Sequence, residues 1–215
     1  MQTILQTMQE MTPLPLRGGK RLFVDIGASA GQQLINAVSS KTTMYDYAVG
    51  YELPENRAAF ETKSQAPPPH VVMRWEDATT VNFARLREQW PEATVVHFFS
   101  FWQGMPADTQ KAILFNICDF ALNNDGQIQV AAGFMYSGYD FSKHTFYQWI
   151  EEWRMKQSAS VQAYTDCMNE LDHHEHDGLV QSGGARYKGM VLNMSSMVAG
   201  SIARPITIGA IISLY

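Results

Sequence analysis

The feature that most constrains this chain of 215 residues is an apolar run that breaks into a turn of small residues and continues as an amphipathic segment. The run is Leu22 to Ile26, the turn is Gly27 to Gly31, and the segment is Gln32 to Val38. This succession predicts strand, tight turn and helix, because glycine permits unusual backbone angles and small side chains let a ligand approach the main chain. We therefore expect free helix-terminal amides to face a bound nucleotide.

Two acidic residues accompany this turn. Asp25 precedes it, and Glu52 ends the next apolar run, Tyr47 to Tyr51. Glu52 lies about 20 residues past the last glycine, where a carboxylate at the tip of the next parallel strand accepts from ribose hydroxyls. No third glycine falls where a pyrophosphate would need it, and Asp25 suits a ligand that carries an amine or a positive charge. The pattern predicts a nucleoside pocket without a pyrophosphate site.

These residues resemble motifs I and II of the class I S-adenosylmethionine-dependent methyltransferases. The closer resemblance is to the DOT1-like histone-lysine methyltransferases, whose first motif reads like residues Val24 to Gln32 and whose second reads like Val49 to Glu52. The resemblance implies S-adenosyl-L-methionine as cofactor, with Asp25 near its methionine part and Glu52 on its ribose. The cofactor-binding residues that it implies here are Asp25, Gly27, Ser29, Gly31, Gln32 and Glu52.

Two later segments extend the resemblance. Asp77 and Ala78 follow the third expected strand and are similar to motif III, which contacts the exocyclic amine of adenine; a helix cap or turn is the alternative for Asp77. After the fourth expected strand, Phe99-Ser100-Phe101 matches the Phe-x-Phe of DOT1-like enzymes, whereas His97 and Phe98 replace their asparagine pair. His97 is thus expected at the cofactor, as a general base or substrate-orienting donor, or else as a histidine satisfied by a backbone carbonyl.

The stretch from Gly133 to Phe141 is expected as an aromatic loop that leaves the fifth strand. Phe134, Tyr136 and Tyr139 are candidates for the substrate wall, because tyrosine holds an alkylammonium by cation–π contact or stacks on a base. Burial in the core is the alternative. The catalytic candidates are His97, Phe99 and Tyr136.

The order of these patterns predicts an α/β fold: a Rossmann-like, seven-stranded methyltransferase sheet with a C-terminal antiparallel hairpin. The hairpin is expected from Arg186 to Met194 and from Ile206 to Leu214. We expect one methyltransferase domain over residues 20–215, after a lead-in segment at residues 1–19. We expect no counterpart here of the large N-terminal helical half of DOT1-like lysine methyltransferases.

Composition narrows the function classes. The net charge of −5 argues against an extended nucleic-acid surface. With two cysteines and no run of about 20 apolar residues, a protein of the reducing cytoplasm without membrane contact is expected.

The polar cluster Asp172 to Asp177 is expected as a solvated loop rather than a metal site, because its spacing matches no zinc motif. The segment from Phe146 to Trp153 is apolar on several faces, which suits the sheet or another subunit of a homo-oligomer.

Several alternatives stay open. The methyl acceptor is unidentified: the motifs favour a protein lysine, and RNA or a small molecule is the main alternative. A cofactor-binding pseudoenzyme that transfers no methyl group is a further alternative. Gly27-x-Ser29-x-Gly31 also matches the nucleophile elbow of serine hydrolases, although few residues precede it. A glycine turn without a ligand is the simplest alternative.

Overall fold

The computed structural model describes residues 19–29, 31–39, 45–58, 68–102, 105–124, 128–137, 148–149, 152–153, 155–156, 175–182, 185–198 and 201–214. At residues 101, 122, 129, 131, 133–137 and 175–214 it describes the backbone only. Nearly all of the expected lead-in, residues 125–127 and residues 157–174 lie outside the described residues.

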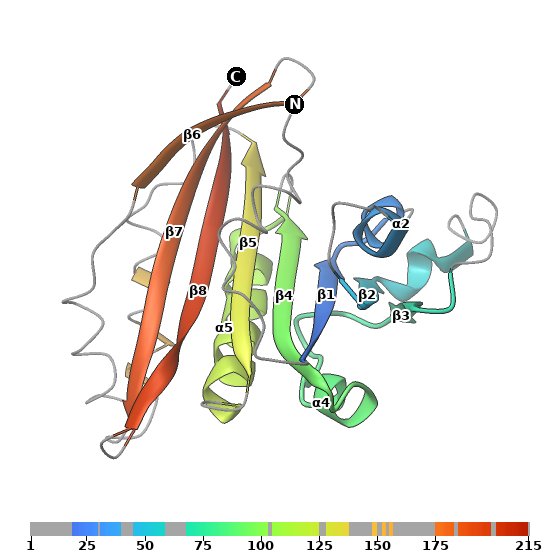
Figure 1. Cartoon of the computed structure of the whole chain (residues 1–215). Helices are drawn as coiled ribbons and strands as arrows, with labels where there is room; N and C mark the ends of the chain where they lie inside the picture. Colours follow the sequence, from blue (N-terminus) through green and yellow to red (C-terminus); the bar gives the residue numbers. More distant parts are fainter. Residues whose placement is uncertain are drawn as a thin grey trace.

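Strands and helices alternate through the first two thirds of the chain, and three strands follow near its end (Figure 1). In order, the elements are β1 (Lys20–Ile26), α2 (Gln32–Ser39), β2 (Tyr47–Glu52), the 3-10 turn η1 (Pro54–Asn56), β3 (Val71–Trp75), α4 (Arg85–Gln89), β4 (Ala93–Phe101), α5 (Ala107–Asn123), β5 (Gln129–Ser137), β6 (Glu175–Ser182), β7 (Ala185–Val198) and β8 (Ser201–Leu214).

The strands form one sheet in the order β3-β2-β1-β4-β5-β8-β7-β6. Strands β1 to β5 are parallel to their neighbours, β8 is parallel to β5, and β7 pairs antiparallel with β8 and with β6. The expected α/β class with a parallel sheet is confirmed. The expected count of seven strands is wrong, because the backbone from Glu175 to Ser182 forms a further strand. Its first three residues belong to the polar cluster that was expected as a solvated loop.

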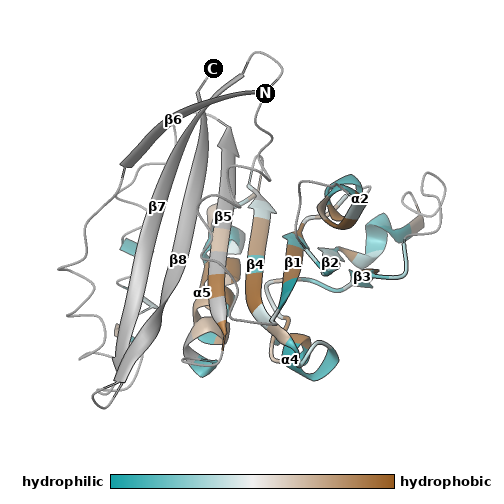
Figure 2. Ribbon diagram, in the orientation of Figure 1, coloured by the Kyte–Doolittle hydropathy of each residue, from teal (hydrophilic) through white to brown (hydrophobic). Residues whose placement is uncertain are grey.

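The two faces of the sheet carry separate cores. Leu22, Val24 and Ile26 point to the face that α4 and α5 cover, whereas Phe23 points to the face that α2 covers. Side chains alternate along a strand, so Asp25 shares the α2 face. Figure 2 shows hydrophobic residues along β1 and β4 and on part of α2 and of α5.

Local predictions held best where the hydrophobic period was clear. The helix expected from Gln32 is α2. The prediction of a loop at Phe134 and Tyr136 was wrong. Both residues lie within β5, which pairs with β4 as far as Met135 and with β8 as far as Ser137. No helix in the described part of the chain has the length and hydrophobicity needed to cross a bilayer.

Candidate functional site

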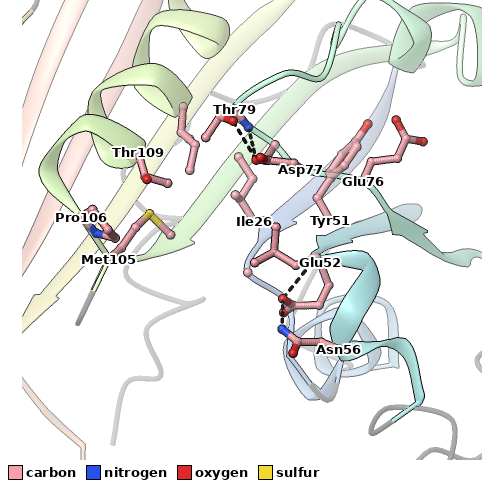
Figure 3. A pocket seen from close by; sticks show the side chains of 14 residues that line it. Ile26, Tyr51, Glu52, Asn56, Glu76, Asp77, Thr79, Met105, Pro106 and Thr109 are labelled. Atoms are coloured by element: carbon pink, nitrogen blue, oxygen red, sulfur yellow. Dashed lines mark hydrogen bonds between the residues drawn. The ribbon is translucent and has the colours of Figure 1, made fainter.

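A cavity of about 620 Å³ lies at the carboxyl edge of the parallel strands (Figure 3). The chain leaves β1 toward β2 and β3 on one side and returns as β4 on the other, and open α/β sheets bind ligands at such a switch point. The walls come from the ends of β1 and β2, the turn after β3 and the start of α5. They consist of Ile26, Gly27, Tyr51, Glu52, Leu53, Asn56, Glu76, Asp77, Ala78, Thr79, Met105, Pro106, Thr109 and Ile113.

The glycine turn after β1 closes onto the end of β2. Gly27, Ser29 and Gly31 adopt positive φ angles of 78°, 46° and 68°. The amides of Gly27 and Ala28 both donate to the Tyr51 carbonyl, at 2.9 and 3.2 Å, and the Gly31 amide donates to the Ala28 carbonyl at 2.8 Å. These three amides of the turn therefore bind β2 and the turn itself, while the expected contact of a nucleotide with the first amides of α2 stays a prediction.

Gly50 is a residue of this region that the sequence analysis did not single out. A Cβ at Gly50 would lie 2.6 Å from both Leu34 Cδ1 and Met73 Sδ, and 2.8 Å from the Ala28 Cβ. Glycine is required there because α2 and the turn pack directly on the backbone of β2. The absence of a side chain thus brings the glycine turn and the tip of β2 together.

Glu52 is the residue that joins the turn to the cavity. Its Oε2 accepts from the Ser29 amide at 2.7 Å, and its Oε1 accepts from the Leu53 amide at 3.0 Å and from Asn56 Nδ2 at 2.8 Å. A carboxylate offers about four acceptor directions, so these three donors leave one for a ligand. Glu52 therefore lies on the cavity wall, as its expected ribose contact requires, and is held there by three donors (Figure 3).

Asp77 and Ala78 also line the cavity. Asp77 Oδ1 accepts from the amide and the hydroxyl of Thr79, at 2.9 and 2.8 Å. Asn116 of α5 donates to the carbonyls of Ala78 and Thr79, both at 3.0 Å, and so holds the turn against the helix. The turn alternative for Asp77 is confirmed, and its contact with adenine stays a prediction.

Asp25 is buried beside this site without lining the cavity. Its side chain is 3% exposed. Burial raises the pKa of Asp25 to about 7, and the negative charge of Glu52 adds to this rise. The carboxyl is thus poised to bind or lose a proton near neutral pH, which is a property that its sequence position alone did not indicate.

His97 and Phe99 lie in the core beneath α2 and not on the cavity wall. His97 Nδ1 is hydrogen-bonded to the Tyr45 hydroxyl, and burial, followed by the positive charge of Arg21, lowers the pKa of His97 to about 3. Phe99 stacks on Phe23 with ring centroids 6.3 Å apart. Strand alternation sends residues 97 and 99 to this face, so their expected roles at the cofactor and the acceptor gain no support.

The remaining expected residues divide between exposed and undescribed positions. Gln32 begins α2 and donates to Asn36 Oδ1 at 3.0 Å, away from the cavity wall. Ser29 is exposed, and among the described residues no hydrogen bond links its hydroxyl to a histidine, as a nucleophile elbow would need. Tyr136 is described only in its backbone, while Tyr139, His173 and His174 lie outside the described residues. In the described part, no three His, Cys, Asp or Glu residues are grouped to hold a metal ion.

Tyr51 and Asn56 are among the polar residues of the cavity that the sequence analysis missed. Tyr51 immediately precedes the expected ribose-binding acid. Because it lies within an apolar run, the sequence pattern indicated a core residue and not a residue of the cavity wall. Asn56 follows Glu52 by four residues in the turn that Pro54 begins, a spacing that returns its side chain to Glu52. That spacing is a signal from which Asn56 could have been found.

Comparison with known proteins adds no evidence on function to this geometry. No protein-family model and no curated protein sequence matches the chain.

Proposed function

We propose that this protein is an S-adenosylmethionine-dependent methyltransferase with a DOT1-like cofactor core. The observation that carries the proposal is an acidic cavity at the switch point of a parallel sheet, bordered by the glycine turn and by Glu52 and Asp77. In this proposal the sheet is a methyltransferase sheet, and β7 with β8 forms its C-terminal hairpin.

The charge of the cavity favours this cofactor over a phosphorylated one. Glu52, Glu76 and Asp77 contribute three carboxylates to the wall, and the fourteen lining residues include no lysine, arginine or histidine. Phosphate groups are recognised by such cations or by free amides, and the amides described in the turn are already bonded. A nucleoside that carries an ammonium and a sulfonium suits an acidic wall.

The shape of the cavity also fits a nucleoside. A Cβ built on Gly27 would meet no atom within 4 Å, so the space beside the turn is open to a ligand. Glu52 would hold the ribose through its remaining acceptor direction, and Asp77 would accept from the exocyclic amine of adenine. The apolar side chains of Ile26, Met105 and Ile113 would contact the flat faces of the base and exclude water.

When bound, the cofactor supplies an electrophilic methyl group on a sulfonium. The chain's contribution is to hold the donor in line with the acceptor and to exclude water, since transfer is a direct displacement that needs little acid–base help. The motif resemblance favours a protein lysine as acceptor. Such a lysine must arrive uncharged, and a site poor in water promotes this by penalising the ammonium form.

The test is calorimetric titration of S-adenosylmethionine and S-adenosylhomocysteine into the wild type, Glu52→Ala and Glu88→Gln. Glu88 is an exposed acid of α4 outside the cavity, so its substitution controls for the loss of one charge. We expect the wild type and Glu88→Gln to bind both ligands. Glu52→Ala should lose at least about a hundredfold in affinity, because it lacks both the charged acceptor and the hydrogen bond from the Ser29 amide that holds the turn.

No binding to folded wild type would overturn the proposal. A transfer assay with a labelled methyl donor and lysine-bearing protein acceptors then separates enzyme from pseudoenzyme, because a pseudoenzyme binds the cofactor and transfers nothing. Ester turnover that Ser29→Ala abolishes would instead support the nucleophile elbow.

A further inference from the structure

The turn that carries Asp77 reaches the cavity beyond the end of the sheet. Strand β3 ends at Trp75, which pairs with Glu52 of β2 as the last residue of that ladder. Residues 76–79 follow and line the cavity without a place in the ladder. The position of Asp77 relative to the other walls therefore depends on contacts outside the sheet.

Most hydrogen bonds described for this turn run between its own members. The amide and the hydroxyl of Thr79 donate to Asp77 Oδ1, as the dashed lines in Figure 3 mark. The amide and the hydroxyl of Thr80 donate to the Asp77 carbonyl, both at 3.0 Å. These bonds set the shape of the turn, but they do not join it to another element of the chain.

Asn116 of α5 makes that connection. Its Nδ2 donates to the Ala78 carbonyl and to the Thr79 carbonyl, both at 3.0 Å. A side-chain amide has two N–H donors, so this contact uses both of them on two consecutive carbonyls. Within the described residues, no other hydrogen bond joins residues 77–79 to a different helix or strand.

The sequence of α5 places this contact directly behind the cavity wall. Thr109 and Ile113 line the cavity, and Asn116 follows them at helical spacing, which puts the three residues on one face of the helix. Asn116 itself is half-buried and does not line the cavity. One helix thus forms part of the wall directly and holds the Asp77 turn beside it through Asn116.

We propose that Asn116 is a positioning residue that fixes the Asp77 turn against the base of the ligand and so sets the preference for adenine. This inference rests on the proposed function, in which Asp77 accepts from the exocyclic amine of adenine. A hydrogen bond weakens steeply as its angle departs from linearity, so an acceptor must be held in direction as well as in distance. Without Asn116 the turn can shift away from α5, and Asp77 loses its alignment with the amine.

Asn56 makes a comparable contact at the ribose side of the proposed ligand. It donates to Glu52 Oε1 at 2.8 Å. The ribose is common to adenosine and inosine, whereas only adenine carries the exocyclic amine. Loss of Asn56 should therefore weaken every such nucleoside alike, and loss of Asn116 should weaken the discrimination between bases.

The experiment measures by calorimetry the dissociation constants of S-adenosylhomocysteine and its deaminated analogue, S-inosylhomocysteine. Deamination replaces the exocyclic amine by a carbonyl, which cannot donate to Asp77. We expect the wild type to prefer S-adenosylhomocysteine by roughly tenfold or more, as for one hydrogen bond to a charged acceptor. Asn116→Ala should lose most of this preference, because its affinity for S-adenosylhomocysteine falls by roughly five- to tenfold while that for the analogue changes little.

Two variants serve as controls. Asn56→Ala should lose affinity for both ligands and keep the wild-type preference. Asn124 donates from Nδ2 to the Phe120 carbonyl at 2.8 Å, outside the cavity, so Asn124→Ala removes a similar contact and should keep both affinities. If Asn116→Ala does not fold, Asn116→Asp takes its place, because its side chain has the same shape and lacks the N–H donors.

The ratio of the two dissociation constants separates positioning from a purely structural role. A structural contact alone would lower the melting temperature of the Asn116 variant and leave this ratio at its wild-type value, and that result would overturn the inference alone. Equal affinities of the wild type for the two ligands would also overturn it. Absence of S-adenosylhomocysteine binding to folded wild type would overturn the proposed function, and the inference with it.

Discussion

The two faces of the sheet use buried polar groups in different ways. Beneath α2, the Tyr45 hydroxyl and His97 satisfy each other within an aromatic cluster that includes Phe23. At the cavity, beside the core that α4 and α5 cover, the Tyr51 hydroxyl has no partner among the described residues. The comparison teaches that two buried tyrosines of neighbouring sequence segments differ in whether the fold completes the hydrogen bond of the hydroxyl.

The largest expected effect lies on the α2 face. Phe23 is fully buried, so Phe23→Ala should lower the free energy of unfolding by about 3–5 kcal/mol, the cost of a cavity left by an aromatic ring. Urea unfolding measures this loss, and Phe115→Ala, at a half-buried ring of α5, should cost less. Folded Phe23→Ala should still bind S-adenosylhomocysteine. If Phe23→Ala kept its stability and lost this binding, the α2 face would contribute to the ligand site, which contradicts the distinction between the two faces.

The second prediction concerns pH and Asp25. The pKa of this carboxyl is raised from 3.8 to about 7 by burial and then by Glu52, so between these values the folded state binds more protons than the unfolded state. Its contribution to stability is therefore present at low pH and lost as pH rises toward 7. The side chain in Asp25→Asn cannot ionise. The free energy of unfolding of this variant, relative to that of the wild type, should therefore rise by up to about 1.4 kcal/mol per pH unit over this range.

Urea unfolding of both proteins from pH 4 to 8 checks this difference. The opposite contribution of His97, whose lowered pKa costs stability as pH falls below 6.5, is common to both proteins and cancels. A difference that stays constant with pH would show that Asp25 ionises freely in the fold.

A smaller effect sharpens the comparison between the two tyrosines. Tyr45→Phe removes the hydroxyl that bonds to buried His97, and it should lower the free energy of unfolding by about 1–2 kcal/mol. Tyr51→Phe removes a hydroxyl without such a partner and should cost nothing. Equal losses in the two variants, measured by urea unfolding, would contradict the distinction between the faces.

The smallest effect is expected at Asn56. Asn56→Ala removes one of the three donors to Glu52 at an exposed position, so stability should change by less than about 0.5 kcal/mol. Affinity for S-adenosylhomocysteine should fall roughly three- to fivefold, because Glu52 is held less firmly. Asn56→Asp, which places a like charge beside Glu52, should lose more. Calorimetry that finds equal affinities in all three proteins would show that Asn56 does not position Glu52.

The amino-acid sequence predicted the α/β class, the strand–turn–helix around Gly27 and the position of Glu52 and Asp77 on one edge of the sheet. These follow from local rules: hydrophobic period, the backbone freedom of glycine, and the meeting of parallel strand ends at a single edge. The extra strand β6 escaped prediction because it begins with polar residues, Glu175 to Asp177, which carry no hydrophobic period that would indicate a strand.

Only the tertiary structure decided which polar residues face the cavity. His97 and Tyr51 both lie in apolar strands and are alike in sequence pattern, yet the α2 core surrounds one and the cavity borders the other. The same holds for the amides of Gly27 and Ala28, whose acceptor is the Tyr51 carbonyl of a neighbouring strand. A sequence specifies the groups and their spacing along the chain, but a hydrogen bond between distant segments exists only once the sheet has assembled.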